Sequence, residues 1–312
     1  MFEIIFLGTS ASAPSIQRGL PAQVIKHNEH RFLVDCGEGT QRQILQSGLG
    51  FKKLNRLLIT HGHLDHILGI GGLVSTYLRW EAISELEIFA GKSALERIHD
   101  LLYKVVIRNT SISFPLNLIP IQEGVIIENN DFLIRAFPVN HRGPDCFGFS
   151  FEEKGKRPFL AEKAEALGIP QGPWRRDLVN GKAVQLPDGR TISSEEVLGD
   201  FEPGTRLVVV GDAGQTENLV EVCRGADALV IEGTYKEEEA EMAQQFAHLT
   251  ARSAAELARK AGVGHLFLTH LSRRYRDKDI KEEAQQAFPD VTIVRDFDSF
   301  QVKKRDKKVQ PI

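Results

Sequence analysis

Short apolar runs recur along the chain, and each ends at glycine, proline or a polar turn residue. Runs of this length that are rich in β-branched and aromatic residues predict buried strands. Between them lie stretches with apolar residues at helical spacing, such as 40–49 and 250–261. Strands that alternate with helices predict an α/β fold. The clearest strand predictions are Phe2–Leu7, Leu57–Thr60, Arg206–Val210, Ala228–Ile231 and Leu266–Thr269.

Two segments depart from this alternation. Three short apolar runs at 116–121, 125–127 and 132–139 follow one another directly, which predicts a meander of strands. From about 152 to 199, charged residues, glycine and proline dominate, and the apolar periodicity is poor. We interpret this second segment as an excursion from the core, a protruding arm rather than a domain.

The composition is that of a globular protein, because 42% of the 312 residues are hydrophobic and 26% are charged. The net charge of −3 argues against nucleic-acid binding driven by overall charge, but it leaves a local basic patch open. Three cysteines without paired spacing predict reduced thiols in a cytoplasmic protein. The N-terminal apolar run is too short for a signal peptide, and no run is long enough to span a membrane. We expect one domain over 1–302 that contains the arm, and a basic tail at 303–312.

The predicted strand at 57–60 leads into the most informative stretch, which reads His61-Gly62-His63-Leu64-Asp65-His66. Three imidazoles and a carboxylate have no packing role at the end of a buried strand, and together they suit zinc or a similar divalent ion. His61 and His63 are two residues apart, so in extended backbone they point the same way and can share one ion. Asp65 and His66 can turn toward a second ion. A polar loop with solvated histidines is the alternative, which ligands elsewhere in the chain disfavour.

Further candidate ligands also follow predicted strands. His270 ends the run Leu-Phe-Leu-Thr-His, which echoes the Leu-Leu-Ile-Thr-His run before the first ligand loop. His141 follows the apolar run at 132–139, and Asp212 lies in a Gly-Asp-Ala-Gly turn. Taken alone, His141 could equally be a surface histidine and Asp212 a turn residue. Asp35 is expected to hydrogen-bond a ligand histidine or a backbone turn.

Ligands at strand ends also predict the architecture. Sites in layered α/β proteins gather at the carboxyl ends of strands. Two sheet-plus-helix halves that contribute ligands from both edges would form an αβ/βα sandwich with the site along the seam. Seven ligands fit two ions, and Asp212 is the best candidate to bridge them, as carboxylates do in two-metal hydrolases.

These residues resemble the His-x-His-x-Asp-His signature of the metallo-β-lactamase superfamily. Within it, further segments resemble those of the ribonuclease Z family of tRNA 3′-processing endonucleases, and the likeness runs from the first strand to about Tyr275. The excursion resembles the flexible arm of that family, and the length of the chain resembles its short form. The segments that carry the likeness are Phe6–Ser10, Asp35–Gln41, Glu232–Thr234, His248–Ala251 and Thr269–Tyr275.

The resemblance implies a reaction, cofactors and partners. It implies a zinc-dependent endoribonuclease that removes the 3′ trailer of precursor tRNA with a metal-activated water. The tRNA would keep a 3′-hydroxyl and the trailer a 5′-phosphate. It further implies a homodimer, a tRNA-binding arm and two Zn²⁺ ions per chain, or other divalent ions such as Mn²⁺.

The resemblance also implies roles for individual residues. Asp65 would orient or deprotonate the attacking water. His248, backed by Glu232, would help the 3′ oxygen to leave, and a carboxylate partner would suit that role because it raises the pKa of an imidazole. The alternative for His248 is a histidine at a helix entry. One ion would be held by His61, His63, His141 and Asp212, and the other by Asp65, His66, Asp212 and His270.

Four residues depart from those common in the family, and none of them removes a metal ligand. They are Gly19, Ala213, Ile231 and Gly233. How the protein recognises the acceptor end of the substrate therefore stays open. Cations that flank the site motifs, Arg18, Arg273, Arg274 and Arg276, are candidates for phosphate contacts. Cations of the arm are candidates for RNA contacts beside Trp174, namely Lys154, Lys156, Arg157, Arg175, Arg176 and Lys182.

Two other functions remain as alternatives. The first is another dinuclear-metal hydrolase of the superfamily, such as a small phosphodiesterase, lactonase or thioesterase, although a small substrate needs no long arm. The second is a non-catalytic RNA-binding subunit, although such a subunit would not need all seven ligands.

Overall fold

The computed structural model describes residues 1–109, 111–304 and 310–311. Most of the predicted basic tail, residues 305–309 and 312, therefore lies outside the described residues. The chain divides into two compact units. The first comprises Met1–Glu152 and Thr205–Ile312, and the second comprises Glu153–Gly204.

The first unit contains two large sheets. Among the described residues, one sheet has eight strands in the order β17-β16-β1-β2-β3-β4-β5-β6. Strands β3 to β6 of this sheet run parallel to one another. Its strands are β1 (Glu3–Gly8), β2 (Ala22–His27), β3 (His30–Val34), β4 (Arg56–Leu58), β5 (Leu86–Ala90), β6 (Leu116–Pro120), β16 (Ser299–Gln301) and β17 (Gln310–Pro311).

The other sheet has seven strands within the described part of the chain, in the order β15-β14-β13-β12-β9-β8-β7. Strands β12 to β15 are parallel, so their carboxyl ends lie at one edge. Its strands are β7 (Gly124–Glu128), β8 (Phe132–Pro138), β9 (Phe147–Glu153), β12 (Arg206–Val209), β13 (Ala228–Glu232), β14 (Leu266–Thr269) and β15 (Val291–Ile293).

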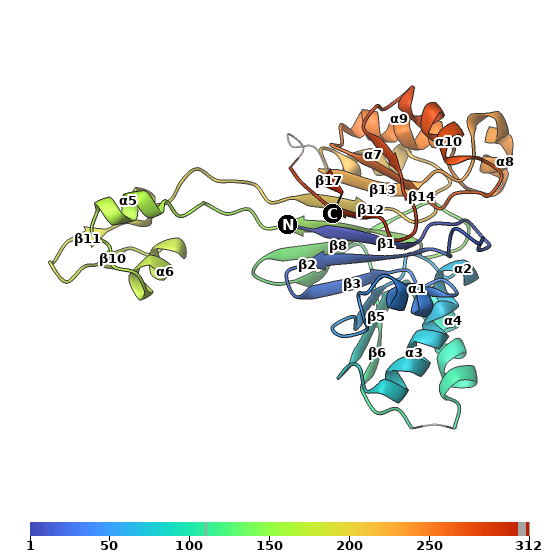
Figure 1. Cartoon of the computed structure of the whole chain (residues 1–312), viewed down its shortest axis with the longest axis horizontal. Helices are drawn as coiled ribbons and strands as arrows, with labels where there is room; N and C mark the ends of the chain where they lie inside the picture. Colours follow the sequence, from blue (N-terminus) through green and yellow to red (C-terminus); the bar gives the residue numbers. More distant parts are fainter. Residues whose placement is uncertain (110, 305–309, 312) are drawn as a thin grey trace. The chain divides into compact units, whose positions relative to one another are not determined.

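Apolar side chains from both sheets form one buried cluster between them, which is rich in phenylalanine, for example Phe6, Phe149 and Phe267. Each sheet buries its other face under helices, as Figure 1 shows for this unit. The first sheet is covered by α1 (Thr40–Gln46), α3 (Gly69–Trp80) and α4 (Lys92–His99). The second is covered by α7 (Val220–Cys223), α9 (Ala251–Ala261) and α10 (Asp277–Gln285). The predicted αβ/βα sandwich is confirmed.

The helix α9 illustrates how local sequence sets these elements. Thr250 is its N-cap and forms a capping box with Ser253, and Gly262 ends the helix with a φ of 62°. Five buried alanines along its inner face let the helix pack closely on the second sheet. The remaining short elements of this unit are α2 (Leu64–Ile67), the π-helix η1 (Asp100–Ile107), η3 (Glu217–Leu219), η4 (Glu237–Glu239) and α8 (Ala240–Gln245).

The predicted strand meander is wrong. The run at 116–121 forms β6, which pairs in parallel with β5 in the first sheet. The runs at 125–127 and 132–139 form β7 and β8, which pair with each other in the second sheet. Short apolar runs bounded by turns do not specify which sheet they join, because that choice depends on pairing partners far away in sequence.

The second unit has a small apolar cluster of its own. Side chains such as Ala164, Leu178 and Val197 are buried in it, and Trp174 packs against it. Its elements are α5 (Ala161–Ala166), α6 (Pro173–Val179), β10 (Val184–Gln185), β11 (Thr191–Ile192) and η2 (Ser194–Glu196). The segment interpreted as an arm therefore folds around a core. It is not basic overall, because Glu153–Gly204 contains 8 Lys and Arg residues against 9 Asp and Glu residues.

Across the described residues, the helices are too short or too polar to cross a lipid bilayer.

Candidate metal centre

Strand ends of both sheets bring the seven predicted ligands together. The loop after β4 carries His61 and His63, and α2 follows at once with Asp65 and His66. The other three ligands, His141, Asp212 and His270, lie within three residues of the ends of β8, β12 and β14. The site therefore lies at the carboxyl ends of strands, where the sequence pattern placed it.

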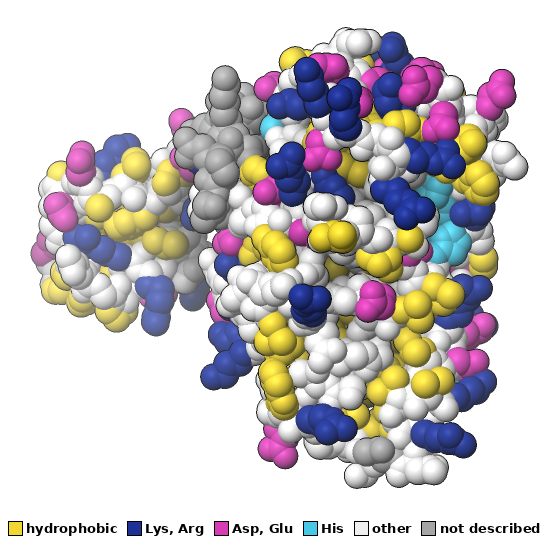
Figure 2. All heavy atoms as spheres, turned by 45° about the vertical axis from the view of Figure 1, so that its right-hand side comes forward, with side chains coloured by type: hydrophobic (Ala, Val, Ile, Leu, Met, Phe, Trp, Pro, Cys, Tyr) yellow, Lys and Arg dark blue, Asp and Glu magenta, His cyan; other side chains and the backbone are white. Residues whose placement is uncertain are grey.

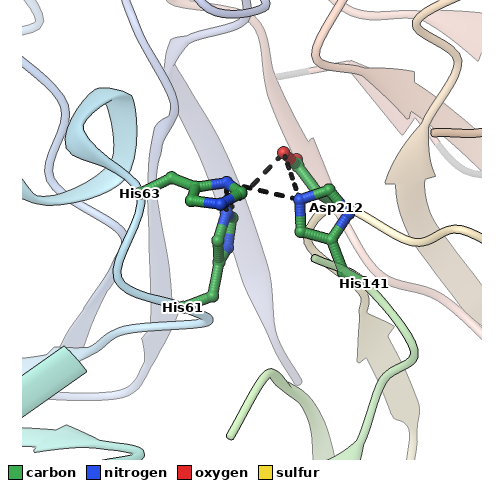
Figure 3. A group of neighbouring side chains, drawn as sticks. All are labelled: His61, His63, His141 and Asp212. Carbon is green, nitrogen blue, oxygen red and sulfur yellow. Dashed lines mark hydrogen bonds and ion pairs between the residues drawn. The ribbon is translucent and has the colours of Figure 1, made fainter. Parts of the chain in front are cut away.

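The first group of ligands consists of His61, His63, His141 and Asp212 (Figure 3). The Nδ1 atom of His63 lies 2.8 Å from Nε2 of His61 and 3.3 Å from Nε2 of His141. Both of those Nε2 atoms lie 3.7 Å from Oδ2 of Asp212. Three imidazole nitrogens and a carboxylate oxygen thus point at one position, as in a zinc site.

The second group consists of Asp65, His66 and His270, and it faces the other oxygen of Asp212. The Oδ1 atom of Asp212 lies 3.5 Å from Nε2 of His66 and 3.3 Å from Nε2 of His270. Oδ2 of Asp65 lies 3.8 Å and 3.6 Å from the same two nitrogens. Asp212 therefore presents one oxygen to each group, which is the geometry of a bridging ligand.

The outer nitrogen of four imidazoles is held by a hydrogen bond, so the inner nitrogen faces the cluster. His66 donates from Nδ1 to Asp35 at 2.8 Å, and His141 donates from Nδ1 to the Ala247 carbonyl at 2.7 Å. Nδ1 of His61 lies 3.0 Å from Oγ1 of Thr60, and Nδ1 of His270 lies 2.9 Å from Oγ1 of Thr234. Such contacts fix the tautomer and the ring orientation of metal ligands.

Buried polar atoms without hydrogen-bond partners indicate whether the cluster suits a cation. Nε2 of His66, Nε2 of His270 and Oδ1 of Asp212 are buried and have no hydrogen-bond partner among the described residues. Burial of such polar atoms without a partner is unfavourable, and all three converge on one position. A cation at that position would satisfy them, so the residues fit a metal ion.

Burial and charge set the protonation states of the ligands. Burial raises the pKa of Asp212, but His270 and His66 outweigh it and hold that pKa well below its usual value. Burial, together with the charge of His66, keeps the pKa of His61 well below its usual value. The pKa of His63 falls to about 4 through burial and the charge of His141. Burial lowers the pKa of His66, but the charges of Asp212 and Asp35 outweigh it and raise that pKa well above its usual value. An ionised carboxylate and neutral imidazoles are the forms that bind metal, so metal binding would displace a proton from His66.

Two residues at strand ends have left-handed backbone conformations. The φ angle is 57° at Asp35 and 53° at His270, although neither is glycine. Such conformations cost free energy and are retained where the surrounding structure imposes them, often at functional sites. Here they aim both side chains into the cluster.

Asp35 links the ligand loop to the second group. Oδ1 of Asp35 accepts a hydrogen bond from the Thr60 backbone amide at 2.8 Å, and Oδ2 accepts one from His66. Asp35 thus contacts both a ligand histidine and a turn, the two alternatives left open by the sequence.

Asp35→Asn should weaken metal binding about 10- to 100-fold, because the amide cannot accept the bonds from Thr60 and His66 equally well. Metal content after equilibration against a graded chelator would measure the loss. Asp227→Asn serves as the control, because it makes the same change at a buried aspartate that accepts a hydrogen bond from the Arg206 amide, outside the metal groups. Unchanged metal affinity in the Asp35 variant would show that the carboxylate does not position His66.

A second feature beside the metal groups is the pair of His248 and Glu232. Nδ1 of His248 lies 3.0 Å and 3.1 Å from the two carboxylate oxygens of Glu232, which is fully buried. Glu232 also accepts hydrogen bonds from the Ala213 amide at 2.7 Å and from Thr234 at 2.5 Å. Burial lowers the pKa of His248, but the charge and hydrogen bond of Glu232 raise it to about 9. This imidazole is therefore suited to donate a proton.

A pocket of about 350 Å³ gives access to these groups. Its lining includes His63, Asp65, Asp212 and His248, together with residues that the sequence did not single out. In the space-filling view, histidine side chains reach the surface among lysine and arginine side chains (Figure 2). The additional lining residues are Ser12, Leu64, Arg97 and Arg142.

Three arginines that the sequence offered as phosphate contacts are already paired. Arg18 is bound to Asp277 at 2.8 Å and to the Val294 carbonyl, and Arg274 is paired with Glu239 at 2.9 Å. The third, Arg276, is paired with Asp279. Adjacency to a motif in sequence did not reveal these partners.

A ribonuclease Z from Bradyrhizobium diazoefficiens is 44% identical over 298 residues, which cover 96% of this chain and 99% of that protein. The chain belongs to the ribonuclease Z family. A ribonuclease Z from Methanothermobacter thermautotrophicus is 37% identical over 98% of both chains. The resemblance found in the sequence is confirmed.

A solved structure and a second family model also match the chain. The short form of human tRNase Z matches with a TM-score of 0.67 over 96% of this chain and 99% of that chain. At 23% identity, this match shows that the two chains share a fold. A family model described as anti-Pycsar protein Apyc1 matches residues 2–160, so this half of the chain belongs to that family as well.

Proposed function

We propose that this member of the ribonuclease Z family is an endoribonuclease that cleaves the 3′ trailer from precursor tRNA. The observation that carries the proposal is the convergence of seven metal ligands beside the His248–Glu232 pair. Membership of the family supplies the reaction class, hydrolysis of a phosphodiester in RNA, and tRNA as the substrate.

The residues fit two divalent ions, and we propose Zn²⁺ because imidazole and carboxylate ligands suit it, with Mn²⁺ as the other candidate. His61, His63, His141 and Asp212 would hold one ion. The other would be held by Asp65, His66, Asp212 and His270. When bound, such a pair supplies Lewis acidity that activates water and neutralises phosphate charge.

Asp65 and His248 would perform the proton transfers. Oδ2 of Asp65 faces the second group, and its position is fixed by the Ser12 amide at 3.1 Å. We propose that this carboxylate orients the attacking water and accepts its proton. His248, held by Glu232, would donate a proton to the departing ribose oxygen. The water oxygen joins phosphorus as the bond to O3′ breaks, which leaves a 3′-hydroxyl on the tRNA and a 5′-phosphate on the trailer.

Incubation with a doubly end-labelled precursor tRNA would test this function. We expect one cut at the junction with the trailer, a 5′-phosphate on the released trailer, and no cleavage after dialysis against a chelator. Restoring Zn²⁺ or Mn²⁺ should restore the cut. Absence of cleavage with both metals would overturn the proposal.

A metal-dependent hydrolase of small substrates is the second candidate. It is favoured by the match to a diphosphatase of the PhnP family, with a TM-score of 0.66, although at 14% identity that match shows the fold alone. The comparison between precursor tRNA and a small phosphodiester therefore decides between the two. Hydrolysis of the small substrate alone would favour this second candidate.

The unit Glu153–Gly204 is proposed to bind tRNA. Its net charge does not favour RNA, so exposed cations on its helices would have to make the contact. Lys163 of α5 and Arg176 of α6 are exposed, as is Lys182. By contrast, Arg157 is paired with Glu195, and Arg175 lies over Phe159.

The base of this unit allows a clean deletion. Lys156 and Glu202 exchange two backbone hydrogen bonds, of 2.9 Å and 2.8 Å, so a two-residue Asn-Gly turn can join them as in a hairpin. Replacing residues 157–201 in this way should lower cleavage of precursor tRNA about a hundredfold, the equivalent of about 3 kcal/mol of lost binding. Hydrolysis of bis(p-nitrophenyl) phosphate should persist. Cleavage of precursor tRNA at the original rate would refute an RNA-binding role for the unit.

The chain is further proposed to form a homodimer in the cytoplasm. Leu64 and Leu68 lie one helical turn apart and are 56% and 41% exposed, which favours burial in an interface. Cys36, Cys146 and Cys223 are buried free thiols, as expected in a reducing compartment. A mass from light scattering would test the dimer.

A further inference from the structure

Two arginines at the pocket are free of acidic partners in the described part of the chain. Arg97 and Arg142 line the same pocket as His63, Asp65 and His248. Arg97 donates a hydrogen bond to the Gly62 carbonyl at 2.9 Å, and Arg142 lies over the Phe246 ring at 5.6 Å. Both side chains are exposed. Arg18 and Arg274, which also lie near the site motifs, are neutralised by carboxylates.

Each of these two arginines is held in place although neither is neutralised. Arg97 belongs to α4, and a Cβ on Gly62 would lie 3.1 Å from Ala94 and 3.5 Å from Arg97. The glycine therefore lets α4 lie close against the ligand loop. Phe246 supports the guanidinium of Arg142 through a cation–π contact. A preorganised guanidinium with an unused charge is suited to bind phosphate.

The two arginines lie beside different groups of the site, and we assign them to different products of the cleavage. Arg142 follows the ligand His141, whose ring centroid lies 5.1 Å from that of His248. Because His248 is proposed to protonate the departing ribose oxygen, this side would hold the last nucleotide of the tRNA. Arg97 contacts the loop between His61 and His63 instead. A phosphate bound there would belong to the trailer.

We propose that Arg142 and Arg97 bind the two phosphates that flank the scissile phosphate, Arg142 on the tRNA side and Arg97 on the trailer side. The inference rests on the proposed function and adds a specificity: the trailer must contain a second nucleotide for Arg97 to act, because a one-nucleotide trailer with a 3′-hydroxyl has no further phosphate. The enzyme should therefore prefer trailers longer than one nucleotide.

Single-turnover cleavage of two precursor tRNAs, with trailers of one and five nucleotides, would test this. The wild-type chain should cleave the longer trailer faster. Arg97→Ala should lose about tenfold on the longer trailer and much less on the shorter one, so the preference disappears. Arg142→Ala should lose about tenfold on both substrates. Arg97→Lys, which keeps the charge, should restore part of the preference.

Controls separate this inference from folding and from the proposed function. Arg79→Ala removes an exposed arginine of the neighbouring helix α3 and should preserve the preference. Metal content and hydrolysis of bis(p-nitrophenyl) phosphate would report whether the ligand loop is intact in Arg97→Ala. An unchanged preference in Arg97→Ala would overturn the inference and leave the proposed function standing. A wild-type chain that cleaves neither precursor would overturn both.

Discussion

Asp212→Asn should abolish cleavage of precursor tRNA and of small phosphodiesters alike. The two carboxylate oxygens of Asp212 face different groups of ligands, and the residue is 4% exposed. An amide keeps one weak oxygen ligand and loses the negative charge that holds two cations together. Metal analysis should show a fall from about two ions per chain to fewer than one, because one group loses its oxygen ligand and both groups lose the shared negative charge.

The matched control is Asp227→Asn, which changes another buried aspartate. Its carboxylate accepts a hydrogen bond from the Arg206 amide at 2.8 Å, outside the metal groups. This control should keep both ions and full activity, although its stability will fall. Retention of two ions by Asp212→Asn would contradict the bridging role. Loss of ions without loss of cleavage would contradict the whole metal mechanism.

His248→Ala should lower kcat on precursor tRNA by about 10²- to 10⁴-fold with little change in KM. The ribose oxygen is a poor leaving group unless it is protonated, and His248 is the imidazole that Glu232 keeps charged. A p-nitrophenyl phosphodiester needs no such proton, because nitrophenolate leaves unaided near neutral pH. Its hydrolysis should therefore survive the substitution.

Glu232→Gln provides the corresponding pH test. Loss of the Glu232 charge lowers the pKa of His248, so the proton donor is lost at a lower pH than in the wild-type chain. The basic limb of the kcat profile should move toward lower pH, and metal content would report whether the Ala213 contact of Glu232 matters for the ligands. A change confined to KM in His248→Ala, or an unmoved basic limb in Glu232→Gln, would show that this pair does not assist the leaving oxygen.

Local sequence was sufficient for part of the fold. Strand β14 has the predicted bounds Leu266–Thr269, and α9, which Thr250 caps, lies within the helical stretch predicted at 250–261. Both elements depend on short-range properties, namely apolar runs and cap chemistry, which are contained in a short stretch of sequence. The assignment of β6 to the first sheet was not predictable, because its partner β5 is selected by a crossover through α4.

The candidate site divides in a similar way. Seven ligands were predicted because imidazoles and carboxylates directly follow apolar runs, which is a local signal. Thr234, which contacts Nδ1 of His270, was not identified, since 36 residues separate them. Arg97 and Arg142 likewise had no signal that set them apart from other surface cations. The ion pair of Arg18 with Asp277, which are 259 residues apart in the chain, could not be predicted from the sequence either.

The sequence by itself determined which groups could do chemistry, because residue type fixes donor atoms, charge and local backbone preference. It also determined the family, since the motifs are contiguous. Only the tertiary structure decided which of these groups meet: that Asp212 presents one oxygen to each group, that Glu232 lies against His248, and which arginines remain unpaired. The physical reason is that coordination and ion pairing act over a few ångströms in space, and folding sets those distances among residues far apart in the chain.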